Sequence, residues 1–76
     1  MSTARENHIA SINALLVKYG ATKDRYDMYH INDYKFDTRA VNLKIFSGKT
    51  KIKSTPMMKV TLESLDKLLK IYSAKE

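Results

Sequence analysis

The first apolar positions of the chain recur with the period of an α-helix. The apolar stripe consists of Ile9, Ile12, Leu16 and Tyr19, with Leu15 on its flank. These residues follow one another at steps of three and four, which places them on one helix face. Thr3 and Glu6 have the spacing of a capping box, and Gly20 is placed to end the helix in a left-handed conformation. The pattern predicts an amphipathic helix over roughly residues 4–19.

The apolar period changes to two after a polar turn predicted at residues 22–25. Two short alternating segments, 26–31 and 34–36, are separated by Asn32-Asp33, a pair suited to a two-residue hairpin turn. Such a hairpin pairs Ile31 with Tyr34 and Tyr29 with Phe36. These four residues form its predicted core face, and the opposite face carries Met28, His30, Lys35 and Asp37.

A second alternating segment surrounds Ser47-Gly48. A tight turn at these two residues places Lys44 opposite Lys51, a mildly destabilising pair of like charges. The predicted core face consists of Val41, Leu43, Ile45, Thr50, Ile52 and Ser54. The predicted exposed face consists of Asn42, Lys44, Phe46, Lys49, Lys51 and Lys53. We expect this ribbon to end at Pro56, which cannot donate to a strand ladder.

A second helix is predicted after Thr61, its N-cap residue. Its apolar stripe consists of Leu62, Leu65, Leu69 and Tyr72, widened by Leu68 and Ile71. Glu63 with Lys67, and Asp66 with Lys70, are favourably ordered pairs four residues apart. Before this helix, Met57 and Met58 are either plugs in the core beneath it or adaptable side chains on a partner-binding surface.

Together these elements predict a single small α+β domain over residues 1–76. Two helices and a meander, each with one apolar face, bury those faces most simply as two layers. The predicted order is helix, three or four antiparallel strands, helix, with both helices packed on one sheet face. The other face of the sheet then remains in water.

The helix-sheet-helix order resembles that of double-stranded-RNA-binding domains and of HicA-type toxin ribonucleases in element order and size. The first family has a lysine cluster at the start of its second helix, where this chain has Thr61-Leu62-Glu63. The second has a Gly-Ser-His element, whereas His30 here follows Met28-Tyr29. Because of these two differences, the chain is assigned to neither family.

Composition limits the class of protein. A chain of 76 residues with 43% hydrophobic residues is apolar enough to fold around one thin core. The absence of cysteine excludes disulfides and thiolate metal sites and is compatible with a reducing cytoplasm, which is the predicted location. The first residues are polar and the longest apolar run is Ala14 to Val17, so we expect no membrane segment.

The net charge of +6 is concentrated in one segment. From Lys35 to Lys59 there are seven basic residues and one acid, whereas the rest of the chain holds seven of each. No acid lies between Thr38 and Leu62. This asymmetry indicates an anionic partner for one surface patch. The alternative is a solvated sheet face whose lysines prevent aggregation.

The sequence contains no recognisable catalytic, cofactor-binding or metal-binding constellation, so a non-enzymatic protein is favoured. His8 and His30 are far apart and lack the spacing of a zinc site, which predicts that both are exposed and structurally idle. The acids lack calcium-loop spacing, and turn formation explains Asp24 and Asp33. The only glycines, Gly20 and Gly48, cannot form a phosphate-binding loop.

The predicted function is nucleic-acid binding, to DNA or RNA, through phosphate contacts with weak sequence preference. The candidate anion-binding residues are Lys35, Arg39, Lys44, Phe46, Lys49, Lys51 and Lys53. Phe46, Tyr26 and His30 are candidates for stacking on an unpaired base. Two alternatives remain: a small protein-interaction module or inhibitor that docks on an acidic partner protein, and a homodimer formed through a sheet edge or a helix stripe.

Overall fold

The computed structural model describes residues 3–74, in which two α-helices flank a five-stranded sheet. The elements are α1 (Ala4–Lys18), β1 (Thr22–Lys23), β2 (Tyr29–Ile31), β3 (Tyr34–Asp37), β4 (Asn42–Ser47), β5 (Thr50–Pro56), the 3₁₀ turn η1 (Met57–Lys59) and α2 (Leu62–Tyr72). The strands lie in the order β1-β2-β3-β4-β5, and each neighbouring pair is antiparallel. The predicted α+β class is confirmed, but the sheet has five strands and not the three or four expected.

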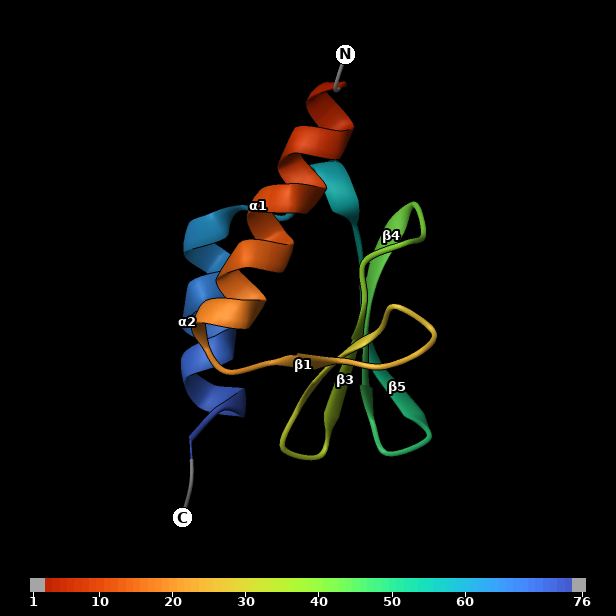
Figure 1. The fold of residues 1–76 in the computed structure, drawn as a ribbon, viewed down its shortest axis with the longest axis vertical. Helices are drawn as coiled ribbons and strands as arrows, with labels where there is room; N and C mark the ends of the chain where they lie inside the picture. Colours follow the sequence, from red (N-terminus) through yellow and green to blue (C-terminus); the bar gives the residue numbers. More distant parts are fainter. Residues whose placement is uncertain (1–2, 75–76) are drawn as a thin grey trace.

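Both helices lie on the same side of the sheet, as predicted (Figure 1). The buried core consists of Ile12, Leu16, Tyr29, Ile31, Phe36, Leu43, Ile45, Met57, Val60, Leu65 and Leu69. Met57 is 1% exposed and therefore belongs to the core, whereas Met58 is 58% exposed. Helices and sheet thus share one apolar layer, and the opposite face of the sheet is left to solvent.

The ends of both helices follow the predicted capping. The Thr3 hydroxyl accepts a hydrogen bond from the Glu6 amide at 3.0 Å, and the Thr61 hydroxyl accepts one from the Ser64 amide at 3.1 Å. At the end of α1, Gly20 has φ of 88° and Ala21 donates back to the Leu16 carbonyl at 3.0 Å. This is the left-handed Schellman arrangement, which satisfies carbonyls that the helix itself leaves unpaired.

The extra strand β1 occupies residues predicted to be a polar turn. Thr22 and Lys23 pair with His30 and Tyr29 of β2. The loop that follows takes over half of the predicted strand 26–31, because the Asp24 carboxylate accepts hydrogen bonds from the amides of Tyr26 at 2.8 Å and Met28 at 3.1 Å. These bonds hold residues 24–28 as a turn and shorten β2 to three residues.

The first hairpin has the predicted register, and the second does not. Asn32 takes φ of 50°, and Ile31 and Tyr29 face Tyr34 and Phe36. In the second hairpin, Ser47 pairs with Thr50, so the turn is Gly48-Lys49 and not Ser47-Gly48. Gly48 has φ of 62°, which matches the type II′ turn, where only the first central residue needs a positive φ.

A β-bulge then changes the face that the later residues of β5 occupy. Moving a two-residue turn by one position keeps every residue on its own face, so Lys51 stays on the predicted side, opposite Phe46. Beyond it, the register shifts between Phe46 and Ile45, whose partners are Lys51 and Lys53, and Ile52 is the extra residue. The bulge reverses the faces of the residues that follow, which places Lys53 opposite the buried Ile45. Predicting Ser54 on the core face was therefore wrong.

Several predicted core residues lie at the surface. Val41 is 74% exposed because it precedes β4, and Ile52 is 45% exposed at the bulge. In α2, Leu65 and Leu69 are buried, whereas Leu62 and Ile71 at the margins of the stripe are exposed. The apolar stripe of α2 is therefore wider than the surface that the sheet covers.

Candidate functional site

The exposed sheet face, on the side away from the helices, carries one continuous row of facing side chains. Residues that are partners on neighbouring antiparallel strands have side chains on the same face. The row runs through Thr22, His30, Lys35, Phe46 and Lys51, from β1 to β5. Two of the predicted lysines therefore flank the predicted aromatic residue, although they lie on different strands and far apart in sequence.

Lys35 and Phe46 are in direct contact within this row. The Lys35 ammonium lies 5.2 Å from the centroid of the Phe46 ring, within the range of a cation–π interaction. Both residues are half-buried, so the sheet restrains them more than it would a fully solvated side chain. Lys51, the partner of Phe46 on its other side, is exposed. The arrangement is a partly accessible ring between two cationic groups.

Lys44 lies on the same face in a neighbouring row, and the predicted repulsion with Lys51 is absent. Its Cα partners are Asp37 on β3 and Ser54 on β5. The prediction was wrong because the turn at Gly48-Lys49 moves Lys51 opposite Phe46, and the bulge beyond it leaves Ser54 opposite Lys44. Lys44 therefore has an acidic neighbour across the sheet and not a basic one.

Arg39 is engaged by a carboxylate of its own segment. Its backbone amide donates to Asp37 Oδ1 at 3.0 Å, and its guanidinium Nε donates to the same oxygen at 3.3 Å. The Asp37 side chain is only 14% exposed, so this oxygen organises the bend between β3 and β4. Arg39 is thus less available for an anionic ligand than the sequence suggested.

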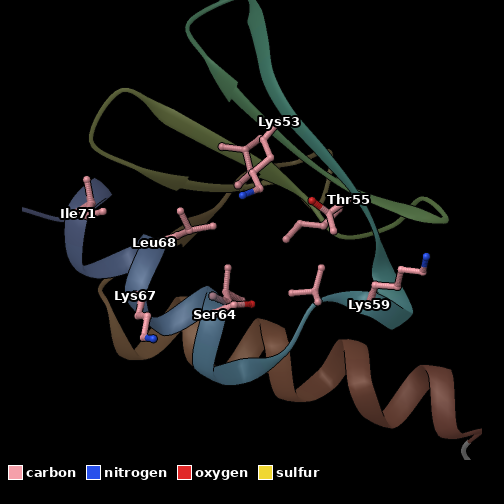
Figure 2. A pocket seen from close by; sticks show the side chains of 11 residues that line it. Lys53, Thr55, Lys59, Ser64, Lys67, Leu68 and Ile71 are labelled. Atoms are coloured by element: carbon pink, nitrogen blue, oxygen red, sulfur yellow. The ribbon is translucent and has the colours of Figure 1, made fainter.

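The remaining two predicted residues do not join the row. Lys49 is exposed in the turn between β4 and β5, at one end of the sheet. Lys53 extends from β5 toward α2, on the helix-facing side of the sheet (Figure 2). Predicting that Lys53 shares a face with Lys44 and Lys51 was wrong, because the bulge at Ile52 intervenes.

Both histidines have polar partners, so the prediction that they are structurally idle was wrong. His8 is partly buried, with its Nε2 at 3.0 Å from the Met57 carbonyl oxygen. His30 Nε2 lies 2.6 Å from Asp24 Oδ2. The hydrogen bond from His30, joined by the amides of Met28 and Tyr26, lowers the pKa of Asp24 to about 2.

The Asp24–His30 contact depends on strand pairing. The sequence indicated a turn role for Asp24, which the amide hydrogen bonds confirm. It did not indicate the imidazole contact, because that requires β1 to pair with β2 across the 24–28 loop. The sequence feature that corresponds to this contact is an acid at the start of a turn, followed six residues later by a histidine on a strand. That spacing alone is too common to identify the pair.

Residues 3–74 contain no group of three or more His, Asp or Glu side chains arranged to hold a metal ion. None of the helices described there is long and apolar enough to cross a membrane.

No protein-family model, curated protein or solved structure matches this chain.

Proposed function

We propose that the exposed sheet face binds nucleic acid, mainly through its phosphates. The observation that supports this is the row in which Phe46 lies between Lys35 and Lys51. From Lys35 on β3 to Lys51 on β5, the row crosses two strand spacings, about 10 Å. It thus presents an aromatic ring and two cations to one extended polyanion.

Each group in the row has a distinct part in this mechanism. The ammonium groups of Lys35, Lys44 and Lys51, with Lys49 at the turn, neutralise phosphates and release counterions. Phe46 stacks on an unpaired base, which favours single strands over duplexes. Lysine offers a point charge and no planar pair of donors, and Arg39 is occupied by Asp37. Weak sequence preference follows.

The acids that flank this face do not cancel its charge. Asp37 is covered by Arg39, and Asp24 is paired with His30. Each of these carboxylates therefore contacts a basic side chain nearby. Lys35 and Lys51 form no ion pair with an acidic side chain within the described residues. A face whose charges served only solubility would mix its signs more evenly.

A salt titration tests the proposal. Binding of a fluorescein-labelled 12-nucleotide single strand of mixed sequence is measured by anisotropy between about 50 and 300 mM salt, a range in which the Debye length is on the order of 10 Å. Four phosphate contacts predict a log-log slope of about −3. The double variant Lys44→Gln, Lys51→Gln removes two phosphate contacts. Its slope should be shallower, about −1.5, and its binding at 0.1 M salt should be weaker by roughly 20-fold.

The matched control is Lys53→Gln with Lys67→Gln, which removes the same charge from the helix-facing side. This variant is expected to keep the slope and most of the affinity. Equal losses in the two double variants would mean that net charge alone drives binding, and the proposal would then be wrong. Unchanged binding in the Lys44/Lys51 variant, with circular dichroism confirming its fold, would leave a merely solvated sheet face.

A further inference from the structure

A groove lies between β5 and α2, on the opposite side of the sheet from the row of Lys35, Phe46 and Lys51 (Figure 2). Its volume is about 290 Å³, near the lower end of the range for ligand pockets. Its apolar lining consists of Leu43, Ile45, Val60, Leu65, Leu68 and Ile71. Ile71 is 67% exposed and so extends this lining to the surface. An apolar group could therefore enter from solvent.

All the charged residues that line the groove are basic, and Thr55 and Ser64 are its neutral polar residues. Lys53 comes from β5, Lys59 from η1 and Lys67 from α2. Within the described residues Lys67 has one ion pair, with Glu63 at 3.9 Å, and Lys53 and Lys59 have none. An occupant that matches both features carries apolar groups for the lining and negative charges for the rim.

The edge of the sheet adjoins this groove. β5 is the last strand in the sheet order, and among the described residues no strand pairs with its outer edge. Lys53 and Thr55 face the groove, so a strand added at this edge would place alternate side chains above the apolar lining. An extended peptide can use these backbone groups, which are strong hydrogen-bonding partners.

Charge disfavours a second copy of the chain as the occupant. The chain has a net charge of +6, and its own β5 carries Lys51 and Lys53. Two such edges in contact would oppose like charges. The same lysines attract an acidic strand. The edge therefore discriminates between partners by charge.

We propose that the β5–α2 groove binds an extended acidic peptide segment of another protein, with apolar residues at alternate positions. The apolar side chains enter the groove, the acids meet Lys53 and Lys59, and the backbone pairs with β5. This site does not depend on nucleic-acid binding, because none of the residues in the Lys35–Phe46–Lys51 row lines the groove.

The probe is a synthetic ten-residue peptide in which Glu alternates with Val or Leu, titrated into ¹⁵N-labelled protein. We expect saturable shifts at the amides of β5 and of Ile71, and slower hydrogen exchange along β5. Ile71→Glu and Lys53→Glu should each weaken binding roughly tenfold, because each places a negative charge against the acidic peptide. A peptide with Lys in place of Glu should not bind.

Two variants serve as matched controls. Val17→Glu adds the same charge at a residue of α1 that is 56% exposed, and Lys18→Glu reverses an exposed lysine of α1 outside the groove. Both should change the affinity less than about threefold. Equal losses in the controls, or no saturation at about 1 mM peptide, the weak limit of specific binding, would overturn the proposal.

Other occupants would give different results. Shifts at the groove amides that grow with protein concentration alone would identify a second copy and overturn the proposal. Displacement of the peptide by the 12-nucleotide strand, with shifts at Lys35 and Phe46, would place the peptide on the exposed sheet face and overturn it as well. Retained peptide binding in the Lys44→Gln, Lys51→Gln variant would support the groove.

Discussion

The two phenylalanines of the chain lie on opposite faces of neighbouring strands, which allows stability and binding to be separated. Phe36 is 0% exposed, its Cα partners are Tyr29 and Ile45, and its ring centroid lies 6.0 Å from that of Tyr72. Phe46 is half-buried on the exposed sheet face, beside the Lys35 ammonium. Truncating the first ring should affect folding, and truncating the second should affect binding.

The expected magnitudes differ severalfold. Phe36→Ala leaves a cavity between the sheet and the helices and costs about 3 to 5 kcal/mol. A chain of 76 residues has a total stability of about 4 to 11 kcal/mol, so this variant loses about a quarter of it or more. Phe36→Leu, which fills most of the space, costs about 1.5 kcal/mol. Phe46→Ala loses one cation–π contact and limited buried area, about 1 kcal/mol.

Urea unfolding followed by far-ultraviolet circular dichroism measures the first effect, and anisotropy with the single-stranded probe measures the second. Phe46→Ala should weaken binding by about 1 to 3 kcal/mol, the contribution of one stacked base. Phe36→Leu should bind like the parent protein while it remains folded. If Phe46→Ala destabilised the fold as much as Phe36→Ala, both rings would lie in the core and the assignment of faces would be wrong.

Two further predictions concern the Asp24 turn and the cap of α2. Because the pKa of Asp24 is lowered from 3.8 to about 2, its stabilising contribution is present above about pH 4 and is lost as the pH falls through about 2; a ¹³C carboxyl titration should show that midpoint, and one near 3.8 would contradict the His30 contact. Thr61→Ala removes the acceptor for the Ser64 amide and should cost about 1 kcal/mol, lowering the melting temperature by about 4 to 8 °C. Thr61→Ser should retain the parent melting temperature, and an equal loss in both variants would contradict the capping role.

The features predicted correctly from the sequence are those decided within a few residues. The N-caps at Thr3 and Thr61, the left-handed Gly20 and the hairpin turn at Asn32 each depend on a side chain and its immediate neighbours. The helical and alternating periods likewise indicated which faces are apolar. These local preferences act before any long-range contact forms, so the chain displays them directly.

The features predicted wrongly depend on pairing between distant segments. The two-residue strand β1 has no apolar alternation and exists because Tyr29 and His30 offer it partners. The bulge at Ile52 has no sequence signal of its own, and it alone decides the face of Lys53. Register in a sheet is a property of two strands, which one strand's pattern cannot specify.

The same division holds for the candidate sites. The sequence by itself determined that the positive charge lies in residues 35–59 and that Phe46 lies among the lysines. Only the tertiary structure decided that Lys35 and Lys51 flank Phe46 and that Lys53 belongs to a separate groove. The reason is geometric: composition states which charges are present, whereas strand register and helix packing decide which of them a single ligand can contact.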